Sequence, residues 1–544
     1  MGDAHLGMAM PRRLQRILLL SFTILLAFWL FYPRRSAIEF RPASIDWTQV
    51  KQRFPSPITH KLPSSRPKHR RLPRVQHEFP NYVHDATTKK RQDAVRAAFV
   101  RCWNSYTKHA WLQDELAPVS GGAKTRFGGW AATLVDTLDT LWIMGLQDEF
   151  RLAAGAVARL DWADTQDTSV NVFETTIRHL GGLLGAYDLS GEKALLAKAR
   201  ELGDMLYVAF DTPNRIPGFW LDFGNARDGL QVAGTADPSA SPCSLSLEFT
   251  RLSQVTGDHK FYDAVSRVTD FLERTQGKSK LPGMWPKLIN FQNEKVDEEG
   301  FTLGALADSL YEYLPKMAAL LDGAEERYER MYRDAMRVVE QHLLFRPMLP
   351  TEEDVDILFA GDAYAHPDRI DHVAEGQHLS CFVGGMFALG GKLFDISEHV
   401  EVGERLARGC AWAYASFPTG LMPEIFNLIA CPSTRIKDPC PWDEERWQKD
   451  GDQHLKKGFV NAREPRYDLR PEAIESLFLL YRITGKGDLR DVAWEMFEAI
   501  MKATQTPIAN SAIEDVTVEG ETKKLDSMEV GPPLFQASWL FWLF

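Results

Sequence analysis

LLGAYDLSGEKALLAKARELGDML, residues 183–206, places an amphipathic segment on each side of a Ser-Gly step. Apolar residues recur at helical spacing in both segments. A glycine fits the left-handed end of a first helix, and the polar residue after it suits the start of a second. The stretch therefore predicts a helical hairpin.

The same pattern recurs along the chain, at residues 247–272, 477–500 and, more loosely, from residue 386. Unevenly spaced copies favour a toroid of helix pairs over a strict solenoid. Strand signals are few, and VTVEG at 516–520 suggests a short β-hairpin near the C-terminus. We expect an all-α toroid of helical hairpins over residues 85–544, in which the loops at one end line a funnel.

The composition is that of a large globular protein with an acidic body. The chain has 544 residues, of which 44% are hydrophobic and 25% charged, which excludes wholesale disorder and a multispanning membrane protein. Residues 1–74 carry 14 Lys and Arg against 3 Asp and Glu, whereas the remainder carries 49 against 71. An acidic body argues against a nucleic-acid partner and suits a carboxylate site for a neutral ligand such as a sugar.

The N-terminal region predicts a membrane anchor and a spacer. Residues 17–32, ILLLSFTILLAFWLFY, are apolar or neutral and are flanked by arginines. As a helix they span about 24 Å, slightly less than a hydrocarbon core of about 30 Å. We expect residues 17–32 to be an uncleaved signal anchor that follows a short cytoplasmic tail at 1–16. A cleaved signal peptide is the alternative, but the sequence lacks the small-x-small cleavage site that such a peptide needs. Residues 33–84, rich in Pro, Arg, Ser and His, predict a disordered stem.

Four acidic residues have unusual sequence neighbours, because they lie among aromatic residues or in a loop. They are Glu174, Asp308, Glu424 and Glu472. Arg178 lies one turn after Glu174, and Glu475 shares a helical face with Glu472. Like charges in a partly dry cavity push their pKa values apart, so that one acid stays protonated while another stays ionised. Glycoside hydrolysis needs such a pair.

Longer motifs carry a resemblance to a known family. They are DELAPVSGGAKTRFGGWAATLVDTLDTLWIMGL (114–146), FETTIRHLGGLL (173–184), SLSLEFTRLSQVTGD (244–258), TLGALADSLYEYLPK (302–316), HLSCFVGGM (378–386), TGLMPE (419–424) and LRPEAIESLF (469–478). Over residues 80–529 the chain resembles glycoside hydrolase family 47, the class I α-1,2-mannosidases. The resemblance implies an (α/α)7 barrel and a calcium-dependent, inverting hydrolysis of terminal α-1,2-linked mannose on high-mannose N-glycans.

The resemblance also implies roles for individual residues. Glu174 matches the general acid, Glu472 matches the general base, and Asp308 and Glu424 match further acids of the catalytic cluster. Residues expected to line the sugar site are Arg178, Glu248, Leu306, His378, Arg470, Glu475 and Glu529. At the position of Leu306 the endoplasmic-reticulum members carry Arg, whereas leucine is similar to the Golgi and fungal members that trim further.

The cysteines indicate the cellular compartment in which the protein folds. Cys381 and Cys410 match the disulfide of the family, and Cys431 and Cys440 could staple a Pro-rich loop. Cys102 and Cys243 are interpreted as buried thiols or a further pair. No CxxC motif or histidine spacing indicates zinc. Disulfides imply an oxidising lumen, so we expect a single-pass type II membrane protein of the Golgi or endoplasmic reticulum, with a luminal, monomeric catalytic domain.

The C-terminus departs from the family after residue 529. The resemblance implies a threonine that binds Ca²⁺ through its hydroxyl and carbonyl oxygens, and residues 530–544 contain no threonine. Only water-mediated contacts from Glu472, Glu475 and Glu529 are then expected, so calcium binding is doubtful. The tail predicts an exposed apolar end. It is either a gene-model error or the mark of a truncated paralogue.

Three functions remain open on these observations. The first is the mannosidase. The second is a catalytically impaired, calcium-deficient luminal mannose lectin, similar to degradation-linked relatives. The third is a membrane-tethered scaffold, which requires the acid cluster to be accidental.

Overall fold

The computed structural model describes residues 37–63, 72–79, 85–353, 355–433, 435–528 and 540–544. The chain divides into two compact units, Met1–Glu39 and Phe40–Phe544. Only residues 37–39 of the first unit are described, so the account below concerns the second.

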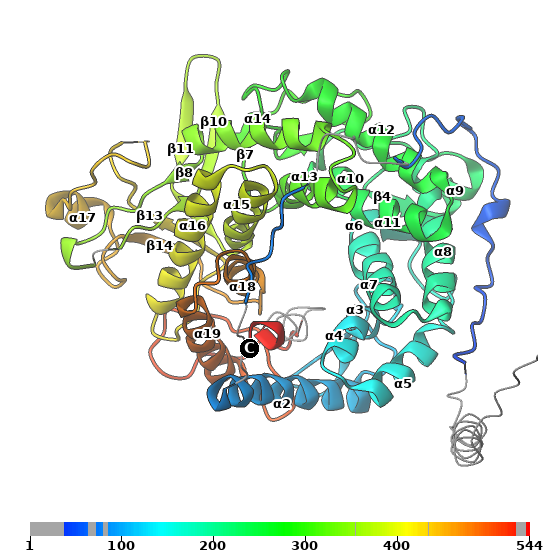
Figure 1. Ribbon diagram of the computed structural model, residues 1–544, viewed down its shortest axis with the longest axis horizontal. Helices are drawn as coiled ribbons and strands as arrows, with labels where there is room; N and C mark the ends of the chain where they lie inside the picture. The colour runs from blue at the N-terminus through cyan, green and yellow to red at the C-terminus, as the bar shows by residue number, and fades with distance from the viewer. Residues whose placement is uncertain (1–36, 64–71, 80–84, 354, 434, 529–539) are drawn as a thin grey trace, which may run out of the picture. The chain divides into compact units, whose positions relative to one another are not determined.

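Helical hairpins arranged in a ring form the second unit (Figure 1). The inner helices, each in contact with the next, are α4 (Leu138–Ile143), α7 (Gly181–Ser190), α11 (Ser246–Thr256), α13 (Asp308–Leu320), α15 (Phe382–Leu393) and α18 (Glu472–Thr484). Each pairs with the outer helix that follows it: α5 (Gln147–Val157), α8 (Lys193–Tyr207), α12 (His259–Thr275), α14 (Arg327–His342), α16 (Ser397–Ala415) and α19 (Asp488–Thr504). The prediction of an all-α, α/α barrel is confirmed.

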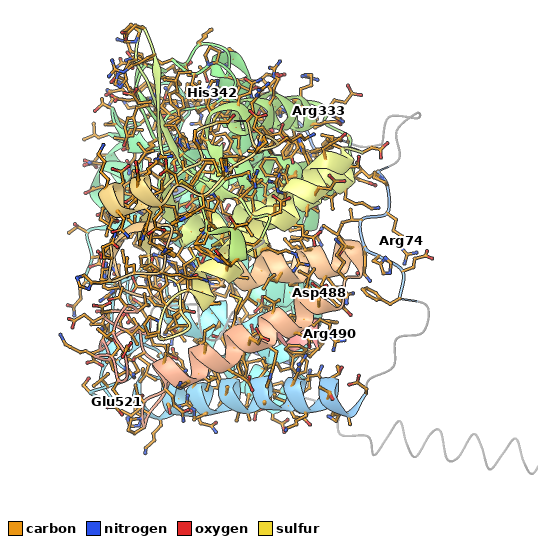
Figure 2. The ribbon with its side chains drawn as sticks, turned by 90° about the vertical axis from the view of Figure 1, so that its left-hand side faces the viewer. Arg74, Arg333, His342, Asp488, Arg490 and Glu521 are labelled. Carbon is orange, nitrogen blue, oxygen red and sulfur yellow. A yellow bond between two sulfur atoms is a disulfide. The ribbon has the colours of Figure 1, made fainter. Side chains whose placement is uncertain are left out.

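A further helix of the ring, α2 (Ala86–His109), is the longest that the structure describes. The shorter helices are α3 (Ala132–Asp136), α6 (Val172–Glu174), α9 (Phe223–Asp228), α10 (Ala240–Cys243) and α17 (Glu444–Asp450), together with short 3₁₀ turns and a π-helix over Thr175–Leu180. An ion pair of 2.7 Å between Arg91 Nη1 and Asp491 Oδ1 joins α2, the first helix of the ring, to α19. Seen from the side, Arg74 and Asp488 lie toward one end of the barrel and Glu521 toward the other (Figure 2).

Small antiparallel sheets lie in the loops. The pairs are β1 (Glu115–Leu116) with β2 (Ala123–Lys124), β3 (Ser169–Asn171) with β4 (Trp220–Asp222), β5 (Asp237–Pro238) with β6 (Leu288–Ile289), and β8 (Leu344–Phe345) with β9 (Phe359–Ala360). Two three-stranded sheets have the orders β11 (Ile370–Val373), β10 (Asp362–Ala365), β7 (Gly300–Phe301) and β12 (Glu375–Gln377), β13 (Ile425–Leu428), β14 (Phe459–Glu464). In place of regular strands at 516–520, isolated antiparallel bridges join Gln505 to Asn510 and Ile513 to Lys524.

The helical hairpin predicted at 183–206 is present, and the glycine and the polar residue at its turn have the expected roles. Gly191 ends α7 with a φ of 71°, a conformation that costs glycine little. The side chain of Glu192 then accepts a hydrogen bond from the Ala194 backbone N–H and caps α8. Residues 257 and 258 repeat the arrangement between α11 and α12, where Gly257 has a φ of 72° and Asp258 caps the second helix.

Helices α15 and α16 approach closely because glycines face each other. A Cβ atom on Gly403 would lie 2.5 Å from the carbonyl oxygen of Gly384, so a larger residue there would force the helices apart. The disulfide between Cys381 and Cys410, whose Cα atoms lie 6.0 Å apart, crosses the same interface. This is the pairing that the resemblance implies.

The remaining cysteines separate into a second disulfide and two thiols. Cys431 and Cys440 are bonded and close a loop of the Pro-rich insertion. Cys102 and Cys243 are buried and unpaired, which decides between the two interpretations left open for them.

Much of the segment expected to be a disordered stem lies against the barrel. Residues 40–63, called the strap below, run along its outer surface beside α8 and α9 (Figure 1). Asp211 accepts hydrogen bonds from the Arg53 and Phe54 backbone N–H groups at 2.7 and 2.8 Å. Asp263 does the same for Thr59 and His60, at 2.9 Å each. The strap is ordered where the sequence predicted disorder. Its hydrogen-bond partners lie on barrel segments more than 150 residues away, so the local composition of the strap does not reveal them.

The apolar C-terminus is also not exposed as expected. Leu540, Leu543 and Phe544 are almost fully buried, whereas Trp542 is 53% exposed. Phe544 packs edge-on against Trp494 of α19, with ring centroids 5.7 Å apart. The arginines Arg91 of α2 and Arg490 of α19 lie over the same ring. The end of the chain therefore fills the space beside α2 and α19.

Several predictions fall outside the described residues. These are the tail at 1–16, the anchor at 17–32 and residue Glu529. Among the helices that the structure does describe, none is both long and apolar enough to cross a membrane.

Candidate active site

A cavity of about 590 Å³ opens where inner helices begin. Asp308 is the first residue of α13, Glu472 is the first of α18, Phe382 is the first of α15, and Glu174 ends the short helix α6. All four line the cavity. Because helix N-termini carry partial positive charge, three carboxylates in first turns can gather in one cavity.

Glu174 is held by local backbone geometry. The side chain of Asn171 caps α6 by accepting a hydrogen bond from the Glu174 backbone N–H at 2.9 Å. The chain then enters the π-helix, and Arg178 Nε donates to Glu174 Oε2 at 2.8 Å. The guanidinium of Arg178 also lies over the ring of Phe127. π-Helical turns are common at functional sites, and this one fixes an acid–arginine pair on the cavity wall.

Asp308 is one candidate for a protonated carboxyl in the cavity. Its Oδ1 accepts a hydrogen bond from the Ser309 backbone N–H at 2.8 Å. Burial raises the pKa of Asp308 to about 7, and the nearby carboxylates Glu312 and Glu472 add to the rise. At neutral pH this carboxyl can therefore hold a proton, the condition that a general acid needs.

Glu472 has a buried histidine behind it. Its Oε2 lies 3.2 Å from His378 Nδ1, and His378 Nε2 lies 2.7 Å from the hydroxyl of Tyr414. His378 is fully buried. The arrangement orients the Glu472 carboxylate toward the cavity and leaves the histidine itself away from a ligand.

Glu475 faces a half-buried lysine. Lys316 of α13 is paired with Glu312, and its Nζ lies 3.5 Å from Glu475 Oε1. Burial raises the pKa of Glu475 to about 7, while Glu312 and Glu472 act in the same direction and Lys316 opposes them. Burial alone would lower the pKa of Lys316, but its two carboxylate partners raise it overall. Lys316 therefore supplies positive charge at this end of the cavity.

Two of the predicted acids lie behind the cavity wall. Glu424 is buried and paired with Arg470, which does line the cavity. Glu248 accepts a hydrogen bond from the Tyr313 hydroxyl at 2.9 Å, and its other oxygen is buried without a partner. Burial raises the pKa of Glu248 to about 7. These two acids support the wall and the arginine rather than facing the cavity.

Leu306 lies at the cavity with a strained backbone. It is 43% exposed and has a φ of 81°, in the left-handed region that non-glycine residues rarely adopt. Its backbone oxygen accepts a hydrogen bond from the Ala240 N–H at 2.9 Å. The contact holds the turn that presents this side chain.

Several lining residues escaped the sequence analysis. They include Asn171, Phe173, Phe219, Ser309, Glu312 and Phe382. Glu312 and Lys316 follow Asp308 at helical spacing on α13, and that periodicity could have revealed them. Asp136 has a pKa raised to about 7 by burial, against the opposing effect of Arg178. No local pattern links Asp136 to a site that is formed some 40 residues later.

The described residues do not fit a calcium ion. Calcium takes six to eight oxygen ligands, and no cluster of three or more His, Cys, Asp or Glu side chains within the described part of the chain could hold a metal. Glu475 is paired with Lys316, and Glu472 with His378. The last described residues, 540–544, offer only apolar side chains.

Comparison with known proteins identifies a family that this chain resembles in sequence and structure. Residues 98–530 match the model of glycosyl hydrolase family 47. A human endoplasmic reticulum mannosyl-oligosaccharide 1,2-alpha-mannosidase is 37% identical over 81% of this chain, and the match spans 58% of the human protein's length. A mannosyl-oligosaccharide alpha-1,2-mannosidase of Penicillium citrinum is 32% identical over 81% of this chain and 84% of its own. The solved alpha-1,2-mannosidase of Trichoderma reesei superposes with a TM-score of 0.75 at 29% identity, over 84% of this chain and 93% of that one.

Proposed function

The chain belongs to glycosyl hydrolase family 47, and on that premise we propose that it hydrolyses terminal α-1,2-linked mannose from high-mannose N-glycans with inversion of configuration. The observation that carries the proposal is the convergence of Glu174, Asp308 and Glu472 on one cavity. The relatives named above act on mannosyl-oligosaccharides, which supports the choice of substrate.

Glu472 is suited to the role of general base. An inverting glycosidase needs a carboxylate that activates water on the far side of the sugar ring. Glu472 stands in the first turn of α18 at the cavity, and His378 Nδ1 lies 3.2 Å from its Oε2. The acid and base carboxyls of such enzymes lie roughly 6.5–9.5 Å apart, which leaves room for that water.

Two carboxyls compete for the role of general acid. The resemblance favours Glu174, which is paired with Arg178 on the cavity wall. The electrostatics favour Asp308, which keeps its proton up to about pH 7. We assign proton delivery to Glu174 and treat Asp308, like Glu475, as a further cavity acid with a raised pKa; substitution of Glu174 and of Asp308 tests the assignment separately.

The binding surface combines charge and aromatic faces. Arg178 and Arg470 offer donors to sugar hydroxyls, and Phe173, Phe219 and Phe382 offer apolar faces. Leu306 itself offers no charged donor to a glycan at this cavity, which supports removal of several mannoses, as in the Golgi and fungal members.

We place the barrel in the lumen of the secretory pathway. Both disulfides support an oxidising compartment. Residues 17–32 are proposed as the anchor, with residues 1–16 cytoplasmic, residues 33–84 as the luminal stem and residues 85–544 as a monomeric catalytic domain.

A mannose-binding lectin is the second candidate. The observation that favours it is the poor fit of the described residues to calcium, since the family's hydrolysis is calcium-dependent. Such a lectin would bind high-mannose glycans in the same cavity without cleaving them.

Proton NMR of the fresh product separates these functions. The hydrolase releases β-mannose first from an α-linked glycan, and the anomers then equilibrate. Release of α-mannose would contradict inversion, and binding without release would favour the lectin.

A further inference from the structure

A second cavity, of about 270 Å³, lies between the strap and the barrel. The strap contributes Ile45 and Trp47 to its wall, and α9 contributes Phe223 and Arg227. Trp162 and Asp167 come from the segment between α5 and β3. Three elements that are distant in sequence therefore build one small cavity.

Three aromatic side chains make this cavity apolar on its inner side. Trp47 is 5% exposed and packs against Phe223 with ring centroids 5.8 Å apart. Trp162 is 1% exposed and meets Trp130 edge-on at 5.6 Å. Aromatic walls of this kind bind the apolar face of a ring by contact.

Both tryptophans in the wall carry an unsatisfied donor. The Nε1 atoms of Trp47 and Trp162 are buried and have no hydrogen-bond partner. Buried indole N–H groups usually have a partner, because an unpartnered one is unfavourable. An occupant with hydroxyl oxygens would supply acceptors after a small adjustment of the side chains.

The polar groups at the cavity's edge complement the donors in its wall. Asp167 and Arg227 are both exposed, so an occupant could offer hydroxyls to a carboxylate and oxygens to a guanidinium. The combination of apolar walls with a few polar groups is typical of small-ligand sites. Because drug-sized ligands take about 300–1,000 Å³, this cavity suits a single small ring.

We propose that this cavity binds one hexopyranose ring, outside the catalytic cavity. The ring stacks against the aromatic wall, its hydroxyl oxygens accept from the two indole N–H groups, and its outer hydroxyls contact Asp167 and Arg227. The assignment does not depend on the hydrolytic activity.

The second cavity and the catalytic cavity each share lining residues with a third, smaller pocket. Asp167 also lines a side pocket of about 210 Å³, together with Asn171 and Glu174. Asn171 and Glu174 in turn line the catalytic cavity.

Fluorine NMR of the full chain, labelled with 5-fluorotryptophan, tests the proposal. Methyl α-D-mannopyranoside should shift the Trp47 and Trp162 signals saturably, and cyclohexanol, which has a ring but one hydroxyl, should not. Trp47→Phe and Trp162→Phe identify the signals. Each keeps an aromatic ring but removes one donor, so each should weaken binding about 2- to 10-fold.

Trp542→Phe is the matched control, because it removes an exposed indole at the C-terminus and should leave the affinity unchanged. Glu174→Gln should also leave these two shifts unchanged, which separates this site from the catalytic cavity. A high-mannose glycopeptide that binds more tightly than the methyl glycoside identifies a glycan as the source of the ring. Absence of a saturable shift in the wild-type chain, or equal shifts with cyclohexanol, would overturn the proposal even if a variant fails to fold.

Discussion

Arg178 donates from Nε to Oε2 of Glu174 at 2.8 Å, so the acid implied by the family resemblance is paired with an arginine one turn along the same segment. A general acid must be protonated when it acts, and burial raises the pKa of two other cavity acids, Asp308 and Glu475, to about 7. This relationship makes the identity of the proton donor an experimental question.

Glu174→Gln should lower kcat on a mannosyl-oligosaccharide by about 100-fold or more, because general acid catalysis typically contributes a factor of that size. The amide keeps the shape of the side chain, so thermal stability and glycan affinity should change little. The measurement is steady-state kinetics beside equilibrium binding of the same glycan.

Asp308→Asn provides the comparison. If Glu174 is the donor, Asp308→Asn should mainly remove an ionisation near pH 7 from the pH–rate profile. A near-normal rate for Glu174→Gln, together with a severe loss for Asp308→Asn, would move the acid role to Asp308.

Glu248→Gln should stabilise the fold increasingly as pH rises. Burial raises the pKa of Glu248 to about 7, above the value of about 4.3 for an unfolded chain. Between those values the folded state binds more protons than the unfolded state, so Glu248 lowers stability by about 1.4 kcal/mol per pH unit. Glu248→Gln has no carboxyl at this position and so does not lose stability in this way. Urea unfolding at pH 4, 5.5 and 7 should therefore show that the free energy of unfolding of the variant increasingly exceeds that of the wild type. An advantage independent of pH would mean that titration of the buried Glu248 carboxyl is not its cause.

The fold was predictable because its signals are local. The Gly191 and Glu192 step between α7 and α8 carries its own helix end and cap. Glu174, Asp308 and Glu472 were visible for the same reason, since each acid stands at a helix start beside aromatic residues. The strap was not predictable: Asp211 and Asp263 order it from segments far away in sequence, and composition alone indicated disorder.

The cavity was harder to predict than its acids. Lys316 follows Asp308 by eight residues, yet only the packing of α13 against α15, and of α15 against α18, brings it to Glu475. Trp47 and Trp162 each look like ordinary core residues in sequence. The cavity between them arises from the path of the strap.

Calcium removal should have little effect on the chain as it stands. The described residues offer no carboxylate cluster for the ion, and Lys316 already pairs with Glu312 and Glu475. Calorimetric titration should therefore detect weak binding or none, and a chelator should leave the thermal unfolding temperature unchanged. Tight binding with loss of stability in chelator would indicate that residues 529–539, which include Glu529, supply the ligands.

Asp263→Asn should release part of the strap. Asp263 accepts the Thr59 and His60 backbone N–H groups, and although burial opposes the shift, these bonds and Arg267 lower its pKa to about 2. Its contribution is thus complete above about pH 4, near the unfolded value, and is lost as pH falls toward about 2. At neutral pH the variant should lose about 1–3 kcal/mol.

Limited proteolysis of residues 40–63 and thermal unfolding measure this effect. Asp334→Asn, at an exposed position on α14, is the matched control and should change neither. Equal proteolysis of the wild type and Asp263→Asn would mean that the strap is held by its apolar contacts alone.

Leu306→Arg should restrict trimming to fewer mannoses. Leu306 lies at the catalytic cavity with 43% of its surface exposed, so an arginine there can reach sugar hydroxyls and fix one branch of the glycan. Leucine and arginine pay a similar penalty for the φ of 81°, so stability should be nearly unchanged. Mass spectrometry of a Man9 glycan digest should show the variant accumulating a larger product than the wild type. Leu306→Met, apolar and of similar volume, should keep the wild-type product distribution. If the arginine and methionine variants gave the same products, charge and reach at this position would not determine how far the glycan is trimmed.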